Sequence, residues 1–112
     1  MNLNADVPKE IVQKAYEAVE IAKKTGKIKR GMNETTKSVE RGIAKLVLVA
    51  KDTNPLEVVM HLPPLCKEKG IPIIIVPSKE ELGAAAGLHI PTSAITIIKE
   101  GDAHNLIKEL SK

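Results

Sequence analysis

The strongest structural signals in the sequence are LVLVA (46–50), IPIIIV (71–76) and AITII (94–98). Each is a continuous apolar run that is rich in β-branched residues and does not alternate with polar side chains. Such runs are typical of strands that are covered on both faces. The sequence therefore predicts buried strands at Leu46 to Ala50, Ile71 to Val76 and Ala94 to Ile98.

Helical patterns follow each of these runs. Pro55 to Lys69 is predicted to be helical except for an interruption at Pro63-Pro64, with Gly70 as its stop. Ser78 to Ala86 begins with a serine and carries Glu81 three residues later, which is the spacing of a capping box.

The last predicted helix is Asp102 to Leu110. Four apolar residues of this stretch fall on one helical stripe: Ala103, Leu106, Ile107 and Leu110.

The first third of the chain predicts two helices joined by a short strand. Val7 to Lys24 is an amphipathic helix with a cap region at Asp6 and a stop at Gly26. Lys27 to Arg30 allows only a short polar strand. Asn33 to Arg41 is a second helix, with Asn33 as its capping residue and its end at Gly42.

Strands that alternate with helices require crossover connections, which favour parallel pairing. We therefore expect a three-layer α/β/α sandwich around a small mixed, largely parallel sheet of about four strands. The 112 residues leave room for one domain of ordinary size, so we expect residues 1–112 to form a single domain.

Composition excludes several classes of function. The chain has one aromatic residue, Tyr16, which argues against an RNA-binding sheet that stacks bases on aromatic rings. A lone cysteine, Cys66, rules out a disulfide scaffold and a zinc finger. No apolar run approaches the length of a membrane span, and Met1 to Asp6 lacks an apolar stretch, so we expect a cytoplasmic protein without a membrane anchor. A monomer in solution is the default expectation.

Basic residues are concentrated in one segment of a chain whose formal net charge is +3. Residues 23–45 hold eight Lys or Arg side chains against two acidic ones, so this segment carries +6 and the remaining chain −3. Such a segment is expected of a site for an anionic partner, because neutralising phosphates requires cations on one surface. A solvated charged face is the alternative.

The start of the second helix gathers an amide, a carboxylate and an amine. Asn33 and Lys37 are four residues apart and Glu34 and Lys37 three apart, so all three can project from one face. An amide donates and accepts at base edges, a carboxylate accepts from base amino groups, and lysine binds phosphate. The alternative is structural: Asn33 only caps the helix and Glu34 only pairs with Lys37.

Two other features carry weaker signals. Gly83 to Gly87 ends a helix and does not open one, so it is no nucleotide loop, and the apolar Leu88 and Ile90 after it either close over the core or contact a partner. An enzyme would have to use Cys66 or the three histidines. Because these histidines fall in separate elements without ligand spacing, we expect no metal site and no cofactor. Cys66 and His61 are five residues apart and would not face each other on a regular helix, which disfavours catalysis by this pair.

With these residues in view, the chain resembles the archaeal members of the L-seven-Ae family of ribosomal proteins. The likeness rests on GMNETTKSVERGIAKLV from Gly31, HLPPLCKEKGIP from His61 and SKEELGAAAG from Ser78, and it extends over nearly the whole chain. The resemblance implies an α/β/α sandwich that binds kink-turn and kink-loop RNA without catalysis. Its implied partners are ribosomal RNA, box C/D and H/ACA guide RNAs, ribonuclease P RNA and ribonucleoprotein core proteins.

The resemblance also implies roles for particular residues. Asn33 and Glu34 would read the guanines of tandem sheared G·A pairs. Phosphates would be held by Lys37, Arg41 and Lys79. The extruded bulge base would pack on the loop formed by Leu88, His89 and Ile90. Ala84 and His89 depart from the residue types common in the family, which often has a basic residue at the first position and a polar one at the second.

The sequence thus favours a structural RNA-binding protein specific for kink-turns. A generic RNA-binding or protein-interaction domain without that specificity remains the alternative, and an enzyme is the third hypothesis.

Overall fold

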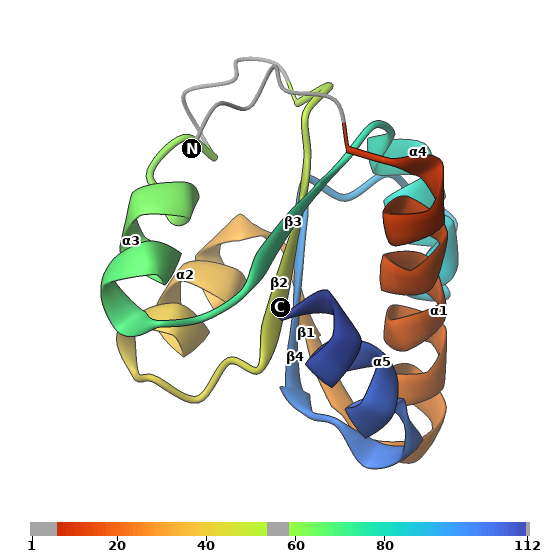
Figure 1. Ribbon diagram of the computed structural model, residues 1–112. Helices are drawn as coiled ribbons and strands as arrows, with labels where there is room; N and C mark the ends of the chain where they lie inside the picture. The colour runs from red at the N-terminus through yellow and green to blue at the C-terminus, as the bar shows by residue number, and fades with distance from the viewer. Residues whose placement is uncertain (1–6, 54–58, 112) are drawn as a thin grey trace.

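The computed structural model describes residues 7–53 and 59–111, in which helices cover both faces of one four-stranded sheet (Figure 1). Helices α1, α4 and α5 lie on one face, and α2 and α3 lie on the other. The predicted three-layer α/β/α sandwich is therefore confirmed. In chain order the elements are α1 (Lys9–Thr25), β1 (Lys27–Arg30), α2 (Met32–Glu40), β2 (Leu46–Ala50), α3 (Leu62–Lys69), β3 (Ile73–Val76), α4 (Lys79–Ala85), β4 (Ala94–Lys99), the 3-10 turn η2 (Gly101–Ala103) and α5 (His104–Leu110).

The sheet is mixed, with strand order β1-β4-β2-β3. Only β2 and β3 are parallel, whereas β4 runs antiparallel to both β1 and β2. The prediction of a largely parallel sheet is wrong. Helix α4 has seven residues and is about 10 Å long. The chain then turns back, and the Thr92 N–H donates to Lys79 O, so β4 begins at the edge where α4 begins.

One edge of the sheet therefore brings several connections together. The register pairs Arg30 with Ile95, Val49 with Ala94 and Ala50 with Val76. The ends of β1, β2 and β3 and the start of β4 consequently lie along the same edge. Helices α2 and α4 both begin at this edge, and residues 86–93, here called the 86–93 loop, return to it.

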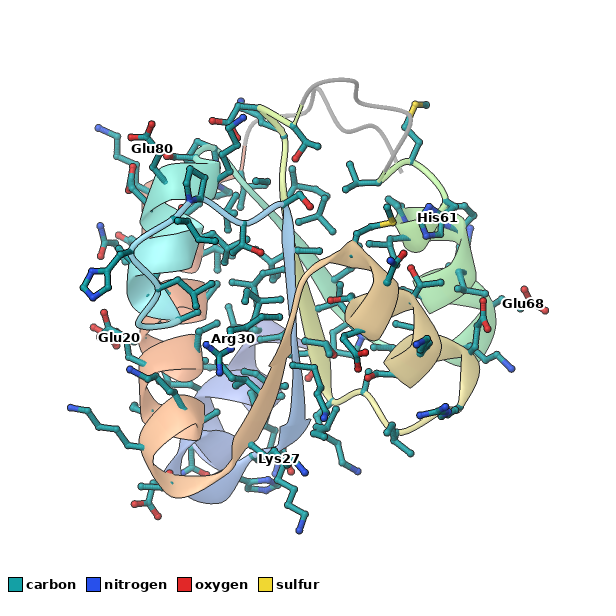
Figure 2. The ribbon with its side chains drawn as sticks, turned by 180° about the vertical axis from the view of Figure 1, so that it is seen from behind. Glu20, Lys27, Arg30, His61, Glu68 and Glu80 are labelled. Carbon is teal, nitrogen blue, oxygen red and sulfur yellow. The ribbon has the colours of Figure 1, made fainter. Side chains whose placement is uncertain are left out.

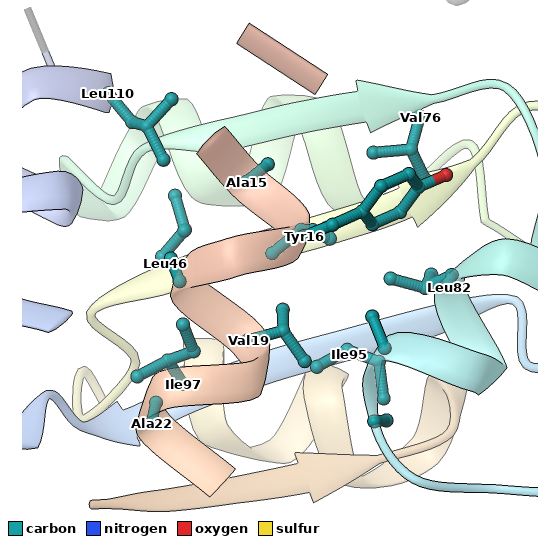
Figure 3. Packing of buried hydrophobic residues seen from close by; sticks show 14 of the residues in the cluster. Ala15, Tyr16, Val19, Ala22, Leu46, Val76, Leu82, Ile95, Ile97 and Leu110 are labelled. Atoms are coloured by element: carbon teal, nitrogen blue, oxygen red, sulfur yellow. The ribbon is translucent and has the colours of Figure 1, made fainter. Parts of the chain in front are cut away.

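The hydrophobic core has two parts, one on each face of the sheet. Figure 3 shows α1 with Ala15, Val19 and Ala22 among Leu46, Ile95 and Ile97 of the sheet. The larger part lies between the sheet and α1, α4 and α5, and the smaller lies under α2 and α3. Burying each Leu, Ile or Val stabilises the fold by about 1.5–3 kcal/mol relative to exposure. This core holds the sheet edge in place.

The helix α3 begins later than its pattern predicts. Residues 54–58 of the predicted stretch lie outside the described residues, and 59–61 form a turn. Pro63 and Pro64 do not interrupt a helix but lie in the first turn of α3, which corrects the prediction. The N–H groups of a first turn have no helical acceptor, so proline costs little there. Gly70 ends the helix with φ 70°, as predicted.

The other predicted elements agree with the structure within two residues, except that the first turn of the last predicted helix is the 3-10 turn η2. Gly26 ends α1, and its N–H donates to Ala22 O. The predicted cap at Asp6 lies outside the described residues. Helix α5 buries Ile107 and Leu110, and Ala103 is buried just before it. Within the described part of the chain, no helix is both long and apolar enough to cross a bilayer.

Candidate nucleic-acid interface

Helix α2 starts directly after β1 at the shared sheet edge. Gly31 adopts φ 92°, a conformation that glycine reaches without a Cβ clash, and its N–H donates to Ala94 O at 2.9 Å. This bond fixes the start of α2 beside the start of β4. The helix buries Thr35, Ser38 and Val39 against the sheet, so its opposite face is presented to solvent.

The exposed face of α2 carries all three residues that the sequence singled out. Asn33, Glu34 and Lys37 are exposed. Lys37 Nζ lies 3.8 Å from Glu34 Oε1, and the two side chains are 57% and 47% exposed. Exposed ion pairs of this kind contribute about 0–1 kcal/mol, so both groups stay available to a ligand. Arg41, one turn beyond Lys37, is also exposed.

Asn33 does not cap α2, which corrects the prediction. The N-cap is Gly31, no side chain caps this helix, and Asn33 is its second residue. Because glycine allows the chain to turn straight from β1 into α2, the helix begins before Asn33. The first helical bond runs from Thr35 N–H to Gly31 O. Within residues 7–53 and 59–111, the N–H groups of Met32, Asn33 and Glu34 have no acceptor.

A hydrogen-bond chain from α3 supports the start of α2. Thr36 Oγ1 donates to Met32 O at 2.8 Å, and His61 Nε2 lies 2.8 Å from the same hydroxyl. A hydroxyl has one proton, so His61 Nε2 must be the donor in the second bond. Figure 2 shows His61 at the beginning of α3, beside α2. His61 is thus a supporting residue that sequence reasoning missed, because the contact spans 25 positions.

The 86–93 loop is held against α4 by backbone bonds. The Leu88 N–H donates to Gly83 O at 2.9 Å, and a Cβ at Gly83 would collide with the Ile90 carbonyl oxygen. Leu88 is half-buried against the core, whereas His89 is exposed and Ile90 is 67% exposed. Leu88 therefore packs against the core, whereas His89 and Ile90 lie at the surface.

Helix α4 starts at the same edge and is capped by the protein itself. Ser78 Oγ accepts from the Glu81 N–H at 3.2 Å, which confirms the predicted cap. Asp52 Oδ1 accepts from the Lys79 N–H at 2.9 Å, and the Tyr16 hydroxyl donates to Ser78 O at 3.5 Å. Burial, and secondly the charge of Glu81, raise the pKa of Tyr16 to about 12. The half-buried Lys79 is the first residue of α4.

Arg30 is a further cation at this edge that the sequence analysis did not single out. It is the last residue of β1, directly before Gly31, and it is exposed. Strand alternation places it on the same face as Ile28, which packs against the larger core. Figure 2 shows Arg30 on the α1 side of the sheet. The sequence could have indicated Arg30 through its position at the end of a short strand, directly before the start of α2.

Cys66 and His61, two of the residues that an enzyme would have to use, differ in exposure. Cys66 is fully buried, and this burial raises the pKa of its thiol to about 11, so it remains a neutral thiol near pH 7. His61 is exposed at the start of α3 and bonds to Thr36. In the part of the chain that the structure describes, no group of three or more His, Cys, Asp or Glu residues is placed to hold a metal ion.

Comparison with known proteins gives two findings. The chain matches the model of the ribosomal protein L7Ae/L30e/S12e/Gadd45 family over residues 13–107. Its structure is similar to that of a protein described as Giardia lamblia 15.5kD RNA binding protein. The TM-score is 0.90 at 35% sequence identity, and the match covers 97% of this chain and 91% of that chain.

Proposed function

The chain belongs to the ribosomal protein L7Ae/L30e/S12e/Gadd45 family, and we propose that it binds kink-turn and kink-loop RNA. It acts as a structural component of ribonucleoproteins in the cytoplasm and catalyses no reaction. Its RNA partners are ribosomal RNA, box C/D and H/ACA guide RNAs and ribonuclease P RNA, with ribonucleoprotein core proteins alongside. The similarity to the Giardia lamblia 15.5kD RNA binding protein supports the proposal that this chain binds RNA.

The observation that carries the proposal is the start of α2. Three helix N–H groups without an acceptor in the described chain lie beside an exposed amide, carboxylate and amine. Asn33 and Glu34 read the guanines of sheared G·A pairs, because a carboxylate accepts from the guanine amino group. Lys37 holds phosphate, assisted by Arg41 and Lys79.

The 86–93 loop takes the bulge nucleotide in this proposal. Ile90 offers an exposed apolar side chain, and it follows the half-buried Leu88 and the exposed His89 in the loop. A base extruded from a duplex has lost its stacking partners, so apolar contact compensates part of that loss. The loop returns to the edge at which α2 begins, so one RNA can contact both.

The protein acts on the RNA by shifting a population. A kink-turn exchanges between a bent and an extended form, and a ligand can favour one only through its difference in affinity for the two. The α2 start recognises an arrangement of G·A pairs that the bent form presents. Binding therefore stabilises the bend without any chemical step.

A titration with two matched RNAs tests the proposal. One RNA carries the kink-turn, and in the other Watson–Crick pairs replace the G·A pairs. We expect the kink-turn RNA to bind at least about tenfold more tightly, since each well-placed base contact contributes about 1–3 kcal/mol of discrimination. Equal affinities would contradict the proposal and favour generic RNA binding through the basic 23–45 segment.

A further inference from the structure

Lys23, on the last turn of α1, lies against the first part of the 86–93 loop. A Cβ at Gly87 would meet the Lys23 ammonium, and Cε and Cδ of the same side chain lie close behind it. Gly87 has φ 76°, where the chain leaves α4 and turns into the loop. The lysine stem therefore lies across the one loop residue that has no side chain.

In the described part of the chain, no carboxylate pairs with the Lys23 ammonium. Its side chain is exposed, and within the described ranges it takes part in no ion pair or hydrogen bond. Glu20 lies one helical turn before Lys23 on α1, but within the described ranges no ion pair joins the two side chains. A cation without a carboxylate partner in the described chain is available to an anionic ligand.

Lys23 also lies on the same face of the sheet as Arg30. Arg30 ends β1 on the face that packs against α1, and α1 itself carries Lys23. A nucleic acid that runs from the α2 start to the 86–93 loop would meet a cation at each end of that path. Contact with Gly87 restricts the lysine stem in the free protein, which lowers the entropy lost when a phosphate binds.

We propose that Lys23 binds an RNA phosphate next to the nucleotide held by the 86–93 loop. This inference rests on the proposed function and adds to it a contact from α1. In this arrangement the 86–93 loop makes an apolar contact with a base, and Lys23, which lies against the loop, binds the adjoining phosphate.

The test compares Lys23→Ala with Lys24→Ala, because Lys24 is an exposed neighbour on the same helical turn. Kink-turn RNA is titrated at several salt concentrations with the wild type and both variants. We expect Lys23→Ala to weaken binding about fivefold and to lower the salt slope by about one, with Lys24→Ala unchanged. Lys23→Arg should retain most of the affinity. A thermal melt of each variant reports whether it is folded.

An RNA probe locates the contact. A neutral methylphosphonate replaces, one at a time, each phosphate flanking the bulge. We expect one of these RNAs to bind the wild type and Lys23→Ala with equal affinity, because the partner charge is gone. If Lys23→Ala and Lys24→Ala behave alike while the wild type still prefers the kink-turn over its Watson–Crick variant, this inference is wrong and the proposed function stands. If the wild type binds both RNAs equally, both are wrong.

Discussion

Helices α2 and α4 begin at the same edge of the sheet, but they differ in whether protein side chains accept hydrogen bonds from the N–H groups of their first turns. The α4 start is closed by the protein: Ser78 and Asp52 accept its N–H groups, and Tyr16 lies behind it. Among the described residues no side chain caps the α2 start, and exposed polar residues lie in the same place. Since unsatisfied N–H groups favour anions, we propose that the N–H groups at the α2 start face the RNA, whereas those at the α4 start are satisfied within the protein and stabilise the fold.

The largest effect is expected for Asn33→Ala, which should change RNA binding without changing stability. Because Asn33 makes no capping bond, Asn33→Ala should leave the melting temperature nearly unchanged while weakening kink-turn binding about 10- to 100-fold. Asn105→Ala, which removes an exposed amide from α5, is the matched control and should change neither. A large loss of stability in Asn33→Ala, with no loss of RNA affinity, would mean that Asn33 stabilises the fold and does not bind RNA.

The link between α4 and its loop can be broken at Gly83. A methyl group there would meet the Ile90 carbonyl oxygen, so the loop must move. We expect Gly83→Ala to lower the free energy of unfolding by about 2 kcal/mol in urea denaturation, as for other overpacked sites. RNA affinity should fall as well, because Ile90 is displaced. Glu80→Gln, an exposed change on the same helix, is the control, and equal stability of the two variants would exclude the collision.

The phenol behind the α4 start predicts a pH dependence. Burial raises the pKa of Tyr16 to about 12 from its ordinary value of 10.0, so the folded state favours the neutral phenol. The associated stability is complete below pH 10 and is lost as the pH rises from 10 to 12. Relative to Tyr16→Phe, the wild type should lose about 1.4 kcal/mol between pH 9 and pH 11 in urea denaturation. A constant difference between the two proteins would show that the phenol is not buried.

The smallest effect is expected at the cap of α4. Ser78→Ala removes the acceptor of the Glu81 N–H and should cost about 1 kcal/mol, or about 4 °C in melting temperature. Ser78→Asp should restore most of it, because aspartate also caps. The preference for kink-turn RNA over its Watson–Crick variant should be the same in all three proteins. A change in that preference would mean that the closed α4 start also reads RNA.

Most elements of the fold follow from local sequence. The buried runs at Leu46, Ile73 and Ala94 are strands, and Gly26, Gly70 and Ser78 mark helix boundaries as expected. Local patterns did not reveal the direction of β4, because that depends on the Thr92–Lys79 bond, which brings the chain back along α4. Pro63 and Pro64 were misassigned because proline disrupts a helix interior but fits a helix start.

The exposed residues of the candidate site could be predicted from the sequence, but the contacts that hold them in place could not. The spacing of Asn33, Glu34 and Lys37 predicted one exposed face, and all three are exposed on α2. The predicted cap at Asn33 was wrong because Gly31 performs the turn. Contacts between distant segments, such as His61 with Thr36 and Lys23 with Gly87, leave no periodic signal in the sequence.

The most direct test of the account combines Glu34→Ala with the two matched RNAs in a double-mutant cycle. If the α2 start reads the sheared guanines, Glu34→Ala will weaken binding to the kink-turn RNA about 10- to 100-fold and will hardly change binding to the Watson–Crick variant. Equal losses on the two RNAs, or no loss on either, would contradict the account.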